Sequence, residues 1–458
     1  MLKECTTPRF LLAAPQSGSG KTTVTCAILR ALLHKKLKVA AFKSGPDYID
    51  PMFHSLVIGA ESRNLDLFLA GRENIKRLFA KNAAGKDIAV LEGAMGFYDG
   101  LGRTAEDSAY DVARTVKAPV ILILNAKGAA LSLAAQIKGF KTFRPDRNIQ
   151  GVILNNVRKM SYLYYKEVLE QEAETKLLGF LPPLEDCSFA SRHLGLVTAG
   201  EIQDLDVIVE KLAAAAEASL DFEGLFTIAQ TAAPLPYEPL VLPEPKPCRI
   251  AVAWDKAFCF YYQDALDLLT SLGATIIKFS PLTDKTLPPC DGVYLGGGYP
   301  ELYARELMEN TAMRGALHDA LAQGLPCFAE CGGFMYLLEH FETTDRSFDW
   351  VGALPGSCHM TKGLQRFGYI SLTAKQDNIF CRAGESIPAH EFHYSDSTNN
   401  GTAFAAVKGS GRGSWECGHA TPDLYAGYPH FHLWGNVRFA ENFVSRCAEY
   451  ARLQGQPK

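Results

Sequence analysis

Short apolar runs recur along the chain, separated by mixed polar and apolar stretches of helical length. The runs are rich in β-branched residues and do not alternate polar with apolar positions, which is typical of strands buried on both faces of a parallel sheet. The pattern predicts strands at residues 10–14, 38–43, 88–92, 120–125, 152–155, 177–181, 250–253, 275–279, 293–295 and 327–330. Strands that alternate with helices predict an α/β fold with two doubly wound parallel-sheet domains, whose sites lie at the carboxyl ends of the strands.

A proline-dense segment separates the two groups of predicted strands. It contains Pro234, Pro236, Pro239, Pro243, Pro245 and Pro247. Because proline at this density permits neither a helix nor a central strand, we interpret the segment as an extended linker; the alternative is a surface loop within one domain. A chain of 458 residues exceeds what one ordinary core fills, so we predict domains at residues 1–230 and 248–458, joined by a linker at 231–247.

The composition excludes several classes of protein. With 47% hydrophobic and 21% charged residues, the chain is typical of a folded globular protein rather than a disordered one. The 46 Lys and Arg residues nearly balance 50 Asp and Glu residues, so we expect neither nucleic acid nor a membrane as a partner. No apolar stretch approaches the roughly 18–20 residues of a membrane span. The 12 cysteines include no Cys-x-x-Cys pair, which predicts reduced thiols and a cytoplasmic location.

The first candidate site is a phosphate-binding loop that follows the first predicted strand and precedes a helical stretch ending near His34. Glycines in the loop let backbone N–H groups approach phosphate oxygens, and the start of the helix favours anions. Lys21 is expected to reach the β- and γ-phosphates, and the Thr22 hydroxyl to coordinate Mg²⁺. The predicted ATP-binding residues of the loop are Ser17, Gly18, Ser19, Gly20, Lys21, Thr22 and Thr23. Pro15 replaces the usual leading glycine, and the alternative is a glycine-rich turn that only caps a helix.

Two further predicted strands lead into acidic side chains, Asp47 and Glu92. If these strands lie beside the first, both carboxylates face the phosphates and, with Thr22, supply the oxygen ligands that Mg²⁺ prefers. Lys43 would add a second positive charge for a transferring phosphoryl group. Each acid could instead be a solvated loop residue. Asn155 is a candidate for hydrogen bonds to the adenine ring, with an asparagine in a turn as the alternative.

The second candidate site is a cysteine between an apolar strand and an apolar helix. Cys331 is followed by two glycines, a pattern typical of a nucleophile elbow, where a helix N-terminus favours the thiolate. His430 and His432 are candidate bases, and on a strand residues two apart point to the same face. An inert buried thiol is the alternative. The expected donors to the oxyanion and to the substrate of this site are backbone N–H groups of Gly297, Gly298 and Gly332.

Residues 390–393 read His-Glu-Phe-His and raise the question of a metal site. A zinc-protease helix needs a histidine at position 394, where this chain has Tyr394, so that interpretation fails. The segment either lines a pocket or forms a polar surface, and the sequence leaves both open.

The two candidate sites together suggest one reaction. A thiol site can release ammonia from an amide such as glutamine by way of a thioester, and a Mg-ATP site can phosphorylate a carboxylate. Joined in one chain, these activities suggest conversion of a carboxylate into an amide. Gln16 stands where partitioning ATPases carry a second lysine, which argues against a scaffold ATPase and for an enzyme. A nucleotide-gated scaffold and a nucleotide-regulated thiol hydrolase are the alternatives.

At this point the chain resembles the cobyrinic acid a,c-diamide synthase family over nearly its whole length. The resemblance rests on seven ordered motifs at residues 17–23, 43–48, 92–96, 192–196, 296–303, 330–333 and 390–395. The N-terminal half is similar to dethiobiotin synthetase, with its P-loop NTPase-like fold, and the C-terminal half to triad (class I) glutamine amidotransferases.

The resemblance implies ATP- and glutamine-dependent amidation of the c and then the a carboxylate of cobyrinate, in the anaerobic branch of cobalamin synthesis. It also implies phosphorylated carboxylate intermediates and ammonia passing between the domains. The implied partners are a tetrapyrrole polycarboxylate, ATP and glutamine, with Mg²⁺ as cofactor, and a homodimer stays open. Close relatives that use other tetrapyrroles are cobyric acid synthase and nickel-sirohydrochlorin a,c-diamide synthase, and these remain alternatives.

The family's nucleophile falls on Cys331 and its histidine on His430. The glutamate that usually follows two residues after this histidine is His432 here, which leaves open what orients His430 and keeps His432 as a possible triad member. The tetrapyrrole pocket has no recognisable motif. Candidate contacts to the phosphoryl group or the tetrapyrrole are Lys43, Arg192, His193, Lys362 and Arg366.

Overall fold

The computed structural model describes residues 2–184 and 199–455. The chain divides into two compact units, built mainly from the residues before and after the boundary at Leu240 and Val241. The proline-dense segment spans this boundary. Its residues Leu235–Tyr237 (β9) pair antiparallel with Lys3–Cys5 (β1), a two-stranded ribbon in which every strand is an edge and proline is tolerated.

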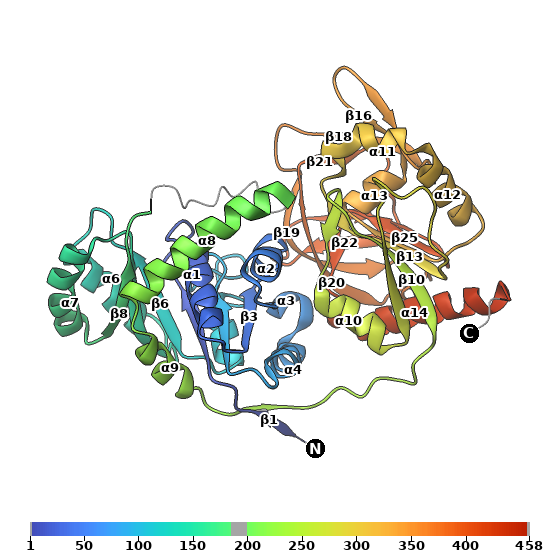
Figure 1. Ribbon diagram of the computed structural model, residues 1–458. Helices are drawn as coiled ribbons and strands as arrows, with labels where there is room; N and C mark the ends of the chain where they lie inside the picture. Colours follow the sequence, from blue (N-terminus) through green and yellow to red (C-terminus); the bar gives the residue numbers. More distant parts are fainter. Residues whose placement is uncertain (1, 185–198, 456–458) are drawn as a thin grey trace. The chain divides into compact units, whose positions relative to one another are not determined.

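The first unit contains a seven-stranded sheet in the order β4-β3-β5-β2-β6-β7-β8, with every pair of strands parallel (Figure 1). The strands are β2 (Arg9–Ala13), β3 (Val39–Ser44), β4 (Ser62–Leu65), β5 (Ile88–Glu92), β6 (Val120–Asn125), β7 (Ile149–Asn155) and β8 (Lys176–Leu181). This confirms the predicted strands of this half, and β4 is an addition, because its polar sequence gives no apolar run.

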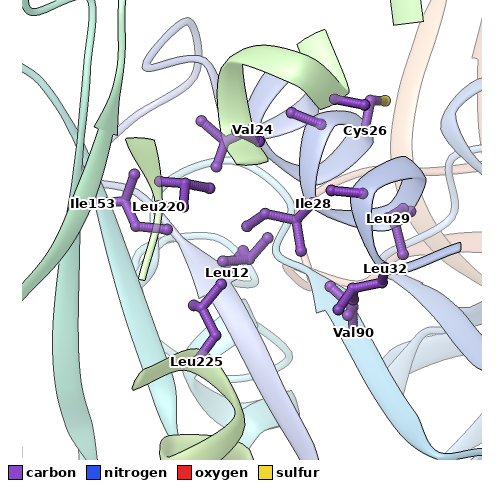
Figure 2. Close-up of a cluster of buried hydrophobic side chains, with 14 of the residues drawn as sticks. Leu12, Val24, Cys26, Ile28, Leu29, Leu32, Val90, Ile153, Leu220 and Leu225 are labelled. Carbon is purple, nitrogen blue, oxygen red and sulfur yellow. The ribbon is translucent and has the colours of Figure 1, made fainter. Parts of the chain in front are cut away.

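Helices cover both faces of this sheet. They are α1 (Lys21–His34), α2 (Ile49–Phe53), η1 (His54–Ile58), α4 (Arg72–Ala83), α5 (Ala109–Thr115), α6 (Ser132–Thr142), α7 (Lys159–Ala173), α8 (Ala199–Ser219) and α9 (Phe222–Gln230). The short helix α3 (Leu67–Ala70) belongs mainly to the second unit. Helices α1, α8 and α9 bury their apolar side chains in one cluster on the sheet. Figure 2 shows Leu12 and Val90 of the sheet in this cluster with Ile28 of α1 and Leu225 of α9. On the other face, α4 packs Phe79 against Phe42 of β3, with ring centroids 5.0 Å apart.

The second unit contains a six-stranded sheet in the order β12-β10-β13-β15-β25-β24, which is parallel except for β24. Its strands are β10 (Cys248–Ala253), β12 (Ala274–Phe279), β13 (Gly292–Leu295), β15 (Cys327–Glu330), β24 (His419–Ala420) and β25 (Leu424–Gly427). The helices of this unit are α10 (Gln263–Ser271), η2 (Pro300–Tyr303), α11 (Ala304–Glu309), α12 (Thr311–Ala322), α13 (Gly332–Leu337), η3 (Leu433–Gly435) and α14 (Val437–Leu453). The two-domain α/β prediction is thereby confirmed.

The second unit also contains strands outside its parallel sheet, which the apolar pattern did not predict. A five-stranded antiparallel sheet has the order β23-β22-β19-β20-β26, and its strands are β19 (Arg366–Ala374), β20 (Ser386–His393), β22 (Phe404–Lys408), β23 (Ser414–Cys417) and β26 (His430–Phe431). A four-stranded sheet has the order β17-β16-β18-β21, from β16 (Leu338–Glu342), β17 (Ser347–Asp349), β18 (Leu354–Met360) and β21 (Ser395–Ser397). Strands β11 (Phe258–Phe260) and β14 (Gly297–Gly298) form a separate pair. Among the described residues, no helix is both long enough and apolar enough to cross a membrane.

Candidate active sites

The glycine-rich loop connects the central strand β2 to α1, which begins at Lys21 and ends at His34, the predicted end of the helical stretch. Gly18 and Gly20 have φ angles of 78° and 92°, a left-handed conformation that glycine adopts without strain. The Ser19 hydroxyl donates to the carbonyl of Gln16 at 3.0 Å and closes the loop on itself. Ser17 and Gly18 are exposed at the tip, and Thr23 is half-buried at the start of α1.

The ammonium group of Lys21 folds back over this loop, where it donates to the carbonyls of Gln16 and Met95. Burial, and then the nearby Lys43 ammonium, lower the pKa of Lys21 to about 8. The lowered pKa means that the protein itself stabilises the positive charge of Lys21 only weakly. An anionic phosphate at the loop would therefore stabilise its charge.

Asn155 lies at the end of β7 and contacts the glycine-rich loop itself. Its side-chain amide donates to the carbonyl of Ser19 at 3.1 Å. A Cβ atom on Gly20 would stand only 2.0 Å from this amide nitrogen, so the close approach requires glycine. The described contacts of Asn155 thus shape the loop, and an adenine contact stays a prediction.

Glu92 ends strand β5 and is the centre of a buried polar cluster. The Thr22 hydroxyl donates to its Oε1 atom at 2.7 Å, and the Lys43 ammonium donates to the same atom at 2.8 Å. Nε2 of His54 lies 3.3 Å from Oε2. Burial alone would raise the pKa of Glu92, but the charges and hydrogen bonds of Lys43 and His54 hold this pKa well below its usual range. The carboxylate is therefore ionised beside the loop.

The neighbouring acids Asp47 and Asp50 have different contacts. Asp47 accepts the backbone N–H of Ile49 at 2.8 Å, whereas Asp50, on the first turn of α2, pairs directly with Lys43. Burial, and then the Glu92 charge, raise the pKa of Asp50 to about 7. Neither Asp50 nor His54 was predicted as a site residue, although Asp50 lies in the same segment after β3 as Asp47.

The arrangement of Thr22 and Glu92 fits a nucleotide-bound Mg²⁺ ion. A hydroxyl oxygen and an ionised carboxylate oxygen lie 2.7 Å apart at the end of the loop. No group of three or more His, Cys, Asp or Glu residues in the described part of the chain is placed to hold a metal by itself. Mg²⁺ usually binds through one or two carboxylates together with substrate phosphates and waters, so a site of this kind would need the nucleotide. Arg192 and His193 lie outside the described residues.

Cys331 stands at a sharp turn between β15 and α13. Its backbone has φ 48° and ψ −105°, an unfavourable conformation for a residue with a side chain and one that clusters at functional sites. Its N–H donates to the carbonyl of Gly427 at 2.8 Å, which holds the turn against β25. A Cβ atom on Gly333 would lie 2.1 Å from the carbonyl oxygen of Leu295, so the turn depends on glycine.

The electrostatic environment of Cys331 differs from the sequence prediction. Burial, and then the carboxyl group of Glu301, raise the pKa of Cys331, whereas the helix N-terminus predicted a stabilised thiolate. The reason is that α13 spans only Gly332–Leu337 and the thiol is 8% exposed, so desolvation outweighs a weak helix end. The thiol is therefore neutral at rest and needs a proton acceptor.

His430 is a buried imidazole that lies against the glycine-rich strand β14. A Cβ atom on Gly297 would be 2.6 Å from Cε1 of His430, and one on Gly332 would be 3.2 Å from the backbone nitrogen of Gly298. The two glycines of β14 thus contact both the histidine and the start of the elbow. Burial, and then the neighbouring His390, lower the pKa of His430 well below its usual range. The imidazole is therefore neutral at rest, which is the form that can accept a proton, but its lowered pKa makes it a weak base until the site is occupied.

His432 lies close to the same group of rings but has different neighbours. Strand β26 ends at Phe431, but the backbone stays extended at His432, with φ −102° and ψ 108°. Its ring packs on Tyr262, with centroids 4.7 Å apart, and burial lowers its pKa to about 3. The hydroxyl of Tyr262 lies 2.8 Å from Nε2 of His390.

The His-Glu-Phe-His segment forms the end of strand β20 and carries buried side chains. His390 lies opposite His430 in the antiparallel register, and His393 stacks on Tyr428 with ring centroids 3.9 Å apart. A polar surface is therefore wrong for His390 and His393, which are buried, and a segment that lines a pocket stays a prediction. Arg366 of β19 lies 3.7 Å from the buried carboxylate of Glu391.

Comparison with known proteins agrees with this geometry. Residues 10–197 match the family model of the CobQ/CobB/MinD/ParA nucleotide binding domain, and residues 249–437 match the CobB/CobQ-like glutamine amidotransferase domain. The chain is 39% identical over 451 residues to a protein of Caldanaerobacter subterraneus subsp. tengcongensis named cobyrinate a,c-diamide synthase, covering 97% of this chain and 99% of that protein.

Two further relatives carry the same name. The protein of Clostridium acetobutylicum is 40% identical over 442 residues, covering 95% of this chain and 99% of its own length. The protein of Listeria monocytogenes serotype 4b is 38% identical over 438 residues, covering 94% and 97%. On the strength of this identity over nearly the full length of both chains, the protein belongs to the cobyrinate a,c-diamide synthase family.

Proposed function

We propose that this protein converts the a and c side-chain carboxylates of cobyrinate into amides, using ATP and glutamine. One observation carries the proposal: a single chain holds a phosphate loop beside an ionised Glu92 and, on the glycines of strand β14, a strained cysteine elbow and a buried His430. The first arrangement activates an acid, and the second liberates nitrogen. Relatives named for cobyrinate support this substrate over nickel-sirohydrochlorin and over the substrate of cobyric acid synthase.

The first unit would form an acyl phosphate. Loop N–H groups and Lys21 bind the triphosphate, while Thr22 and Glu92 would hold Mg²⁺, which neutralises phosphate charge when it is bound. A carboxylate oxygen of the tetrapyrrole attacks the γ-phosphorus, and the bond to the β-phosphate oxygen breaks to release ADP. Lys43 pairs with Glu92 and Asp50, keeps Glu92 ionised and holds both acids in place next to the loop.

The second unit would hydrolyse glutamine. The thiol proton of Cys331 moves to His430 as the sulfur attacks the amide carbon, and N–H groups of Gly298 and Gly332 stabilise the oxyanion. His430 returns the proton to the leaving nitrogen, so that ammonia departs and a thioester remains. Water then hydrolyses the thioester to glutamate. Ammonia attacks the acyl phosphate carbon, and phosphate leaves as the amide forms.

The decisive experiment is a mass-spectrometric assay of purified protein with Mg-ATP, glutamine and each candidate tetrapyrrole in turn. Cobyrinate is expected to gain two amides, with ADP and glutamate produced in step. A gain of four amides on a partly amidated substrate would support cobyric acid synthesis instead, and amidation of nickel-sirohydrochlorin alone would overturn the substrate assignment. Glutamate release without any amide product would support a thiol hydrolase.

The remaining expectations belong to the same proposal. A cytoplasmic location suits an enzyme that uses ATP and reduced thiols, and every cysteine in the described residues is free. Sedimentation of the purified protein would decide whether it forms a homodimer.

A further inference from the structure

Glu330 is the last residue of β15 and stands directly before Cys331 in the chain. Its side chain is 1% exposed. Oε1 accepts the backbone N–H of Phe431 at 2.6 Å, and Oε2 accepts the hydroxyl of Tyr294 at 2.7 Å. Each carboxyl oxygen therefore has a partner, and both partners are buried.

The bond to Phe431 joins two different sheets of the second unit. Glu330 belongs to the six-stranded parallel sheet, in which β15 pairs with β25, whereas Phe431 belongs to β26 at the edge of the five-stranded antiparallel sheet. Strand β26 contains only His430 and Phe431, and β20 is its one partner strand in the described residues. A strand this short has few backbone hydrogen bonds, so a buried side-chain acceptor adds substantially to its fixed position.

The imidazole of His430 is also confined on its two sides. Its ring stacks on His390 with centroids 4.9 Å apart and planes 18° from parallel. On another side it approaches Gly297 so closely that a Cβ atom there would be 2.6 Å away. The ring can therefore change its place only if the backbone of β26 moves, and Glu330 holds that backbone.

We propose that Glu330 is the positioning residue of the thiol site, fixing His430 relative to Cys331 through the backbone of Phe431. The inference rests on the proposed glutamine hydrolysis and deepens it, because it names what orients the histidine. The residue next to the nucleophile thereby sets the place of the base, so elbow and base are held by one side chain. Misplacement of a catalytic group by about 1 Å costs on the order of 100-fold in rate.

The environment of Glu330 indicates which substitution should preserve this role. Burial raises the pKa of Glu330 to about 8, so the carboxyl group is mainly neutral at pH 7. Glutamine has the same shape as a neutral glutamic acid, and its amide oxygen can accept the Phe431 N–H while its NH₂ group donates to Tyr294. Alanine removes both contacts, and aspartate is too short to make them from the same backbone.

The test compares steady-state glutamine hydrolysis by wild-type protein, Glu330→Gln, Glu330→Asp and Glu330→Ala. We expect Glu330→Gln to keep kcat within about threefold, and the other two to lose roughly 10- to 100-fold in kcat with little change in KM. Amide synthesis driven by added ammonia should be unchanged in all three. The rate at which a glutamine-like chloroketone labels Cys331 should fall in parallel with kcat.

Asp291→Ala provides a matched control. Asp291 is another buried carboxylate of this unit, bonded to the backbone and side chain of Arg249 at 2.7 and 3.0 Å, and its loss should lower stability while leaving kcat intact. If Glu330→Ala does not fold, kcat is compared between wild type, Glu330→Asp and Tyr294→Phe. The loss in kcat should be smaller for Tyr294→Phe, because the contact between Glu330 and Phe431 remains.

Three results would overturn the inference: wild-type kcat in Glu330→Ala, equal losses in Glu330→Gln and Glu330→Ala, or an equal loss in Asp291→Ala. Wild-type protein that hydrolyses no glutamine would overturn the proposed function together with the inference. Active wild-type protein with an equally active Glu330→Ala variant would overturn the inference alone.

Discussion

Replacement of Gly297 by alanine tests the placement of His430 with the addition of a single methyl group. The new Cβ atom would lie 2.6 Å from Cε1 of His430 and 3.3 Å from Cβ of Phe260. Non-bonded carbon atoms prefer about 3.5–4.0 Å, so the imidazole must shift by about 1 Å. His430 is 3% exposed and stacked on His390, which leaves it no free space on that side. Gly297 is in strand β14 and has no positive φ, so alanine causes no backbone strain of its own.

A shift of about 1 Å in a catalytic base predicts a fall of roughly 100-fold in kcat for glutamine hydrolysis. The assay is glutamate release at saturating glutamine, with ammonia-driven amide synthesis measured on the same preparation. Gly315→Ala is the matched control, because Gly315 lies in α12 and its added Cβ meets nothing within 4 Å. That variant should keep full activity and gain up to about 1 kcal/mol of stability. Undiminished glutamine hydrolysis by Gly297→Ala would refute the close approach of His430 to β14.

Further predictions concern both units. Cys331→Ser should abolish glutamine-driven amidation and spare ammonia-driven amidation, and loss of both in folded protein would contradict separate sites. Lys21→Ala should abolish both, because without the activated acid no nucleophile can react; continued turnover with ATP would contradict its role. Arg9 is fully buried and donates to the carbonyls of Val116, Thr7 and Ala233, so Arg9→Ala should lower the free energy of urea unfolding by about 3 kcal/mol or more. Because the pKa of Glu330 is raised to about 8 by burial, its contribution to stability is full below about pH 4.5 and is lost as the pH rises through 8. Between about pH 4.5 and 8, the free energy of unfolding of Glu330→Gln should therefore rise relative to that of wild type by up to about 1.4 kcal/mol per pH unit. Urea unfolding of both proteins at pH 5 to 8 measures this difference, and a difference that does not change with pH would argue against a buried neutral acid.

Features that depend on neighbouring residues alone could be predicted from the order of the amino acids. Parallel strands could be predicted from their apolar runs, because both faces of such a strand are buried. The sequence predicted a helix after the glycine-rich loop and a sharp turn at Cys331, because glycines permit backbone conformations that other residues rarely adopt. Ordered motifs also indicated the family before any contact was known.

Contacts between side chains that are distant in the sequence, and the desolvation of each side chain, depend on the folded structure and could not be predicted. Asp50 and His54 gather around Glu92 because β3 and β5 are neighbours in the sheet, and Glu330 reaches Phe431 across two sheets, about a hundred residues apart in the chain. The short antiparallel strands of the second unit were not predicted, because they are defined by their pairing with other strands and not by an apolar run. Burial raises the pKa of Cys331, whereas the sequence predicted a stabilised thiolate. The difference could not be predicted because the cost of removing a charge from water depends on all the atoms packed around it, and these come from the whole fold.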